Sequence, residues 1–296
     1  MDMFFYHLMV WKRGESMFSQ IWQVGLDIQS HCVRAVAAQH RRSGWQLRHW
    51  WQQALPQPVL RDGYLEQSET LITLLKQWRI RLPRHISLRI ALPAQRVLQQ
   101  TLSLPDHRLR EPVRHDYITT QGLKKFPLDS QTLAMDYRLA LPNTNQLLLT
   151  AARQHELQQW LHCLQQADLQ PQVIEITPCV LCAMAAFAGL APDVGLLHRL
   201  EQEWLWVAPR NTPFAYGVLP ASENSSAQQA LVVMRAACPV LGNKVVYYSS
   251  VLDEELPTGT LPWSPFTAFK QLHPPLPAQP MAFVLAAGLA LRRGDR

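Results

Sequence analysis

A short stretch near the start of the chain has the residue types of a phosphate-binding hairpin. Residues 24–30 are VGLDIQS, and Asp27 could position a metal ion or an attacking water. Ser30 could donate a hydrogen bond to a phosphate. A glycine two positions after the acid would let backbone N–H groups approach an anion. Gln29 stands there instead, so we expect a strained turn and a side chain where a phosphate would lie. The segment is interpreted as the remnant of such a hairpin.

The elements around this stretch follow from the spacing of apolar residues. Three consecutive runs with strand-like alternation occur twice, which predicts two antiparallel meanders. The first has its runs at residues 21–28, 32–38 and 45–51, and the second at 194–200, 204–208 and 214–219. A meander followed by alternating helices and strands, and then by a second meander, indicates a duplicated α/β lobe.

Helical spacing alternates with strand-like runs between and after the meanders. We expect helices over residues 69–78, 108–125, 154–168, 178–189, 228–237 and 281–293. We expect strands over residues 86–92, 96–102, 133–139, 147–152, 173–177 and 244–248. Residues 256–280 are rich in proline and lack periodicity, so they are predicted to form a loop.

The composition is typical of a globular protein. Hydrophobic residues make up 48% of the 296 residues, and no apolar run approaches the ~20 residues that span a bilayer. The apolar residues 1–10 precede Lys12 and Arg13, the reverse of the charge order in a secretory signal. Five cysteines without an export signal indicate a reducing compartment. We expect residues 1–19 to form a poorly ordered extension, with Met17 as an alternative start.

The positive charge is concentrated in one segment. Residues 79–125 contain ten Lys or Arg against three acidic residues, a net +7, whereas the whole chain carries +6. Such a segment could attract an anionic membrane surface, nucleic acid or an acidic partner, or it could be an ordinary solvated surface. Direct DNA binding by stacking is not favoured, because most tryptophans fall at core-like positions of predicted strands and helices.

Several stretches together resemble the PilM-type pilus assembly proteins of the actin-like superfamily, and in particular the enterobacterial members termed HofM, which are linked to the use of external DNA. The stretches are IWQVGLDIQSHCVRAV (21–36), RDGYL (61–65), IALPAQRVLQQTLSLP (90–105), KKFPLDSQTLAMDYRL (124–139), LLLTAARQHELQQWLHCLQQADLQPQVIEITP (147–178) and AAGLALRRG (286–294). Residues 191–280 match poorly.

The resemblance implies a two-lobed actin-like, ribonuclease-H-like duplicated α/β fold with an extra subdomain inserted in the first lobe. The first lobe would comprise residues 20–83, 171–190 and 281–296. The partner-binding insert would be 84–170, and a reduced second lobe 191–280. The resemblance also implies a cytoplasmic protein, peripheral at the inner membrane.

In the actin-like fold two hairpins clamp a nucleotide, each with an Asp-x-Gly turn. The second hairpin should fall near residues 196–200, where His198 and Leu200 take the places of the acid and the glycine. With both turns altered we predict no catalytic residue, no metal and no required cofactor, and only a degenerate contact at Asp27 and Ser30. The alternative is an ATPase that retains ATP binding, with Glu175 orienting water and Arg199 contacting phosphate.

The resemblance implies that the chain binds the N-terminal cytoplasmic peptide of a PilN-type or HofN-type inner-membrane protein in a type IV pilus-like or DNA-uptake apparatus. The peptide would lie in a groove between the first lobe and the insert. The groove walls would come from residues 86–92, 96–102 and 154–168. The expected contacts are Arg89, Arg96, Leu98, Leu102, Leu157 and Leu161. The alternative is that these leucines simply fill the core of the insert.

Overall fold

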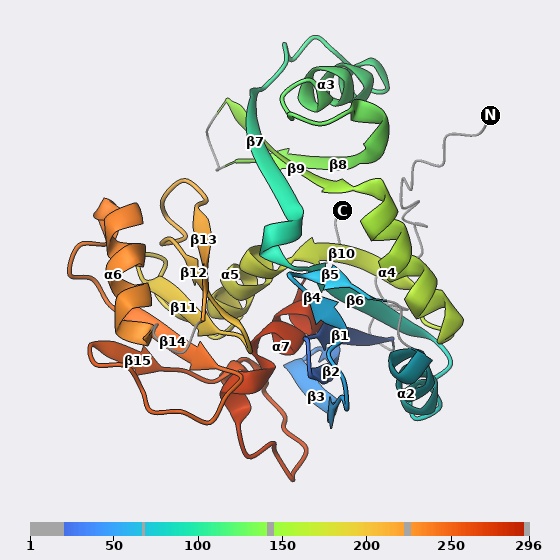
Figure 1. Cartoon of the computed structure of the whole chain (residues 1–296), viewed down its shortest axis with the longest axis vertical. Coiled ribbons are helices and arrows are strands. Elements are labelled where there is room, and N and C mark those ends of the chain that lie inside the picture. The colour runs from blue at the N-terminus through green and yellow to red at the C-terminus, as the bar shows by residue number, and fades with distance from the viewer. Residues whose placement is uncertain (1–20, 67–68, 141–144, 222–225, 293–296) are drawn as a thin grey trace.

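Two five-stranded sheets stand side by side in the computed structural model, and a three-stranded sheet projects from the first of them (Figure 1). The structure describes residues 21–66, 69–140, 145–221 and 226–292. The poorly ordered extension predicted for residues 1–19 lies outside the described residues.

The first sheet has the order β3-β2-β1-β6-β10. Its strands β1 (Trp22–Ile28), β2 (Cys32–Arg41) and β3 (Gly44–Ala54) form the predicted antiparallel meander. On the other side of β1, β6 (Ile86–Leu92) and β10 (Pro171–Ile176) pair in parallel. The strand β6 lies within the range predicted for the insert, residues 84–170. It is nevertheless a central strand of the first lobe, because it has a sheet neighbour on each side.

The second sheet repeats this order as β13-β12-β11-β14-β15. The predicted second meander is confirmed by β11 (Gly195–Arg199), β12 (Glu203–Val207) and β13 (Tyr216–Pro220), while β14 (Val246–Ser250) pairs with β11 in parallel. The edge strand β15 (Thr260–Pro262) falls inside the predicted loop. Three residues held by backbone pairing are too few to show periodicity in the sequence. The repeated order confirms the duplicated lobe.

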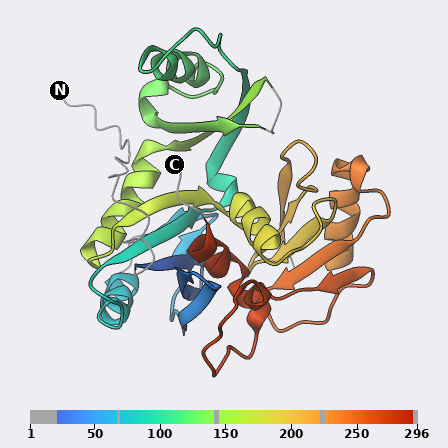
Figure 2. The same cartoon turned by 180° about the vertical axis from the view of Figure 1, so that it is seen from behind.

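Helices cover both faces of the two sheets. The helices α5 (Thr177–Phe187) and α7 (Val284–Leu291) lie between the sheets and share one core cluster with residues of both (Figure 2). On the outer sides, α2 (Glu69–Arg79) and α4 (Gln154–Gln166) pack on the first sheet, and α6 (Ala227–Ala237) packs on the second. The lobes are therefore joined through two central apolar helices.

Gly25, in the stretch that resembles a phosphate hairpin, is required for packing. A Cβ atom at this position would lie 2.0 Å from the carbonyl oxygen of Ala286 and 2.6 Å from the backbone nitrogen of Ala290. Only glycine lets α7 approach β1 this closely. The glycine of this stretch therefore serves the contact between sheet and helix.

The insert is a small unit with its own core. Its sheet has the order β7-β9-β8, with β7 (Val97–Ser103), β8 (Leu133–Leu139) and β9 (Gln146–Arg153) all antiparallel. One face is covered by α3 (Val113–Leu123), which packs Ile118 against the sheet. This helix is shorter than the predicted 108–125, because Pro112 disfavours a helical conformation for the residue before it.

Two further short strands join the insert to the first lobe. The hairpin of β4 (Leu60–Arg61) and β5 (Tyr64–Leu65) lies beside α4. A short 3-10 turn, η1 (Ala94–Arg96), leads from β6 into β7. The base of the insert is thus fixed by this hairpin, by η1 and by α4.

Candidate functional site

The first hairpin turn is closed by its own side chains. The N–H of Gln29 donates to the carbonyl of Cys32 at 2.9 Å, and Gln29 Nε2 donates to Asp27 Oδ1 at 2.6 Å. Among the described residues, the non-glycine residues with positive φ are Asp62 and Asp168. The predicted strain at Gln29 is therefore wrong. The turn closes without a left-handed residue, and the glutamine side chain holds the aspartate.

Asp27 and Ser30 are both buried, at 5% and 6% exposure. Burial raises the pKa of Asp27 to about 6, and the nearby Arg34 guanidinium and the Gln29 hydrogen bond only partly oppose this. The hydroxyl of Ser30 donates to the carbonyl of Leu60 at 2.9 Å. The two residues predicted as degenerate phosphate contacts thus have protein partners in this structure.

The second hairpin repeats the geometry of the first with different side chains. The N–H of Leu200 donates to the carbonyl of Glu203 at 2.8 Å, as that of Gln29 does to Cys32. His198 therefore lies at the position of Asp27, and Leu200 at that of Gln29, as predicted from the sequence. His198 is fully buried, its Nδ1 lies 2.8 Å from Ser249 Oγ, and burial lowers its pKa to about 3. A neutral imidazole replaces the second acid.

The two hairpins contact each other directly. The backbone N–H of His31 donates to Glu201 Oε2 at 2.7 Å, and the His31 ring nitrogen Nδ1 lies 3.3 Å from the same oxygen. Arg34, on β2 opposite Asp27, donates through Nη2 to the carbonyl of Val251 at 3.4 Å. Protein groups from one lobe therefore bind to the hairpin of the other.

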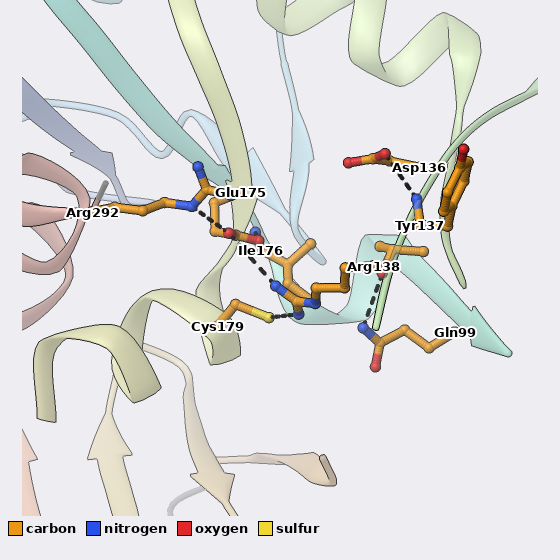
Figure 3. A network of polar contacts seen from close by, with 9 residues as sticks. Gln99, Asp136, Tyr137, Arg138, Glu175, Ile176, Cys179 and Arg292 are labelled. Atoms are coloured by element: carbon orange, nitrogen blue, oxygen red, sulfur yellow. Dashed lines mark hydrogen bonds and ion pairs between the residues drawn. The ribbon is translucent and has the colours of Figure 1, made fainter. Parts of the chain in front are cut away.

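Glu175 does not have the free carboxylate that a water-orienting residue needs. Figure 3 shows it between two arginines, Arg292 and Arg138, whose guanidinium nitrogens lie 2.7 and 3.8 Å from Glu175 Oε2. Arg138 reaches this position from β8 of the insert. It also donates to the thiol of Cys179 and lies over the ring of Phe214 in the second lobe, 5.5 Å from its centroid. Glu175 thus anchors the insert and the end of α7.

Arg199, the other residue of the ATPase alternative, is also bound within the protein. Its Nη1 donates to the carbonyl of Leu200 at 2.6 Å, and its guanidinium lies 4.5 Å from the centroid of the Trp204 ring. No group of three or more His, Cys, Asp or Glu side chains that could hold a metal ion occurs in the part of the chain that the structure describes. Glu175 and Arg199, which the ATPase alternative requires, are thus both bound within the protein.

The two predicted arginine contacts are both engaged internally. Arg89 is 4% exposed on the central strand β6, and its Nη1 lies 3.5 Å from the carbonyl of Ala290. Burial lowers its pKa to about 10. The expectation that Arg89 contacts a partner at a surface groove is therefore corrected. Arg96 forms an ion pair with the buried Glu156 on α4.

The four predicted leucine contacts divide into two groups. Leu102 packs on the core of the insert, and Leu157 packs on the core of the first lobe. Leu98 on β7 is 37% exposed, and Leu161 on α4 is partly buried. The alternative that the leucines fill the core of the insert accounts for Leu102, whereas Leu157 belongs to the first lobe. Leu98 and Leu161 remain candidates for a partner contact.

The basic segment is less available than its charge suggests. Arg79 donates to three backbone carbonyls, those of Asp168, Pro83 and Arg84. Arg89 is buried and Arg96 is paired. Three of the ten basic residues in 79–125 therefore serve internal contacts.

Three residues of the site were not predicted from the sequence: Arg34, Glu201 and Arg138. A charged residue within the apolar run 32–38 was a signal that Arg34 is buried, because a buried charge needs a specific partner. Glu201 and Arg138 carried no such signal. Their partners lie 170 and 37 residues away along the chain, and only the fold brings them together.

The chain matches known proteins over most of its length. Residues 25–193 match the family model described as type IV pilus assembly protein PilM. The chain is 28% identical over 279 residues to the DNA utilization protein HofM of Escherichia coli (strain K12). The aligned residues cover 93% of this chain and 98% of that protein.

Two solved structures share the fold. The PilM-PilN type IV pilus biogenesis complex aligns with a TM-score of 0.67 at 19% identity, covering 90% of this chain and 97% of the other. The cytoplasmic domain of EpsL, an inner-membrane component of the type II secretion system of Vibrio cholerae, aligns with a TM-score of 0.53 at 10% identity, covering 92% and 95%. Together with the duplicated sheets, these matches confirm the predicted actin-like fold. No helix among the described residues is long and apolar enough to cross a membrane.

Proposed function

The chain belongs to the family of type IV pilus assembly proteins PilM, and we propose that it is a non-catalytic cytoplasmic adaptor of a type IV pilus-like or DNA-uptake apparatus. Its partner would be the N-terminal cytoplasmic segment of a PilN-type protein of the inner membrane. The similarity along nearly the whole chain to the PilM-PilN complex carries this proposal.

The clamp between the lobes supports the absence of catalysis. Asp27 is held by Gln29, Glu175 is bound by two arginines, and the second hairpin has a histidine that stays neutral. A nucleotide hydrolase needs an ionised acid and accessible backbone N–H groups at this place. Each of these three side chains is instead held by a contact within the protein.

The insert offers an edge on which an extended peptide can pair. In the sheet order β7-β9-β8, one edge of β7 has no strand neighbour among the described residues. A peptide that adds to such an edge gains affinity from main-chain hydrogen bonds and its register from side-chain contacts. We propose that the partner segment runs along β7, with Leu98 as an apolar contact and Gln99 as a polar one.

Binding can be tested by calorimetric titration with a synthetic peptide of the partner's cytoplasmic N-terminus. The wild-type chain should bind it, and Leu98→Asp should weaken binding at least tenfold, because a carboxylate would be buried without a partner. Val113→Asp is the matched control. It introduces the same charge at another exposed apolar side chain of the insert, on α3, that is 58% exposed, and it should bind like the wild type.

Two outcomes would count against this placement. A folded Leu98→Asp variant with wild-type affinity would exclude the β7 edge as the binding site. Equal weakening by both variants would show that charge, rather than position, controls binding.

A further inference from the structure

The tips of the two hairpins form a contact that spans the lobes. His31 follows the first turn, and its backbone N–H points to the carboxylate of Glu201 in the second turn. The distance of 2.7 Å is typical of a charge-assisted hydrogen bond. The Glu201 side chain is only 13% exposed, so competition from water is limited. The backbone N–H groups of a tight turn are a general binding place for anions.

We propose that Glu201 is a built-in anion that occupies the first hairpin's anion-binding N–H and thereby holds the two lobes closed. The carboxylate belongs to the second lobe and the N–H to the first. Separation of the lobes breaks this bond, and no other molecule is needed to form it.

Neighbouring contacts place the carboxylate at a real junction between the lobes. Gln95 in η1 donates to Glu203 Oε2 at 3.0 Å, two residues along from Glu201. Arg34 donates to the carbonyl of Val251, which follows β14 in the second lobe. Three polar contacts thus connect the second lobe to the rest of the chain near the two hairpins. In the contact of Glu201, a carboxylate accepts from the backbone N–H of a turn.

Buried polar atoms without a protein partner lie on both sides of this junction. They are Asp27 Oδ2 and Arg34 Nε and Nη1 on the first lobe, and His198 Nε2 on the second. Such atoms need water or an ion as a partner. Closure of the lobes at Glu201 keeps these groups out of bulk solvent, so opening should hydrate them and free the His31 N–H for an external anion.

Hydrogen exchange at the His31 amide tests the proposal, because that N–H is the donor of the bond. In Glu201→Ala the exchange should become at least tenfold faster, as expected when a charge-assisted hydrogen bond is lost. In Gln202→Ala it should stay at the wild-type rate. Gln202 is exposed in the same turn and provides the matched control.

Inorganic phosphate serves as the probe for the vacated N–H. It should slow the His31 exchange in Glu201→Ala and leave the wild type unchanged, because the wild-type site already holds a carboxylate. Glu201→Gln should show intermediate exchange, since its amide oxygen still accepts a hydrogen bond without the charge. This variant decides the question if the alanine variant does not fold.

Wild-type exchange in both Glu201 variants would overturn the proposal. So would faster exchange in Glu201→Ala that phosphate does not slow. The measurement uses no partner peptide, so its failure is distinguishable from failure of the adaptor function.

Discussion

Replacement of Asp27 by asparagine should stabilise the protein at neutral pH. The carboxyl is 5% exposed, and burial raises its pKa from the ordinary 3.8 to about 6. The folded state therefore favours the uncharged acid, which asparagine mimics in shape and charge. Gln29 Nε2 can still donate to the asparagine oxygen, as it does to Asp27 Oδ1.

The size and sign of the effect follow from linkage. Because the folded pKa is the higher one, wild-type stability falls as the pH rises from 3.8 to about 6 and stays lower above that range. The full difference corresponds to roughly 3 kcal/mol, so we expect Asp27→Asn to be about 1–3 kcal/mol more stable at about pH 7.5. At about pH 4.5 the difference should shrink to roughly 1 kcal/mol or less.

Urea denaturation followed by tryptophan fluorescence at both pH values measures this difference. His198 acts in the opposite direction, because its lowered pKa makes the folded state lose stability as the pH falls below 6.5. That contribution is present in both proteins and cancels when they are compared. Asp116→Asn, at an exposed carboxylate, is the control and should change stability by less than about 0.5 kcal/mol.

Two results would refute this account of Asp27. One is a variant that is less stable than the wild type at neutral pH, which would mean that the ionised carboxylate makes a favourable contact such as one with Arg34. The other is a difference that does not change with pH.

Two further substitutions test how the hairpin and the insert are held. Gly25→Ala should prevent folding or lower the melting temperature sharply, because its Cβ would lie 2.0 Å from the carbonyl oxygen of Ala286. A melting curve like that of the wild type would contradict the close packing of α7 on β1. Arg96→Met should destabilise the chain by about 1–3 kcal/mol in urea denaturation, because the buried Glu156 loses its nearest ion-pair partner and keeps the more distant Arg153, whose Nε lies 3.7 Å away. The double variant with Glu156→Leu should recover most of that loss, and a double variant as unstable as the single one would show that Arg96 acts otherwise.

The elements of this fold were largely predictable, because apolar runs bounded by polar residues mark the strands of both meanders. Two elements differ from the prediction, each for a physical reason. The strand β15 has three residues, too few for a period to appear, and the helix α3 begins after Pro112 rather than at residue 108.

The candidate site was less predictable than the elements. Arg89 was expected to contact the partner from a groove wall, but a place on the central strand buries it beside the carbonyl of Ala290. Leucines that fill a core and leucines that line a groove have the same sequence pattern. The sequence therefore does not show that Leu102 packs in a core while Leu98 is partly exposed. The contact of His31 with Glu201 depends on how two distant hairpins meet, which no local pattern contains.

Binding of the membrane partner should not require a nucleotide. The most direct measurement is a calorimetric titration of the wild-type protein with the cytoplasmic N-terminal peptide of the PilN-type partner, first alone and then in the presence of Mg-ATP. We expect saturable binding without nucleotide and the same affinity when Mg-ATP is added. Peptide binding that appears only with Mg-ATP, or no binding under either condition, would contradict it.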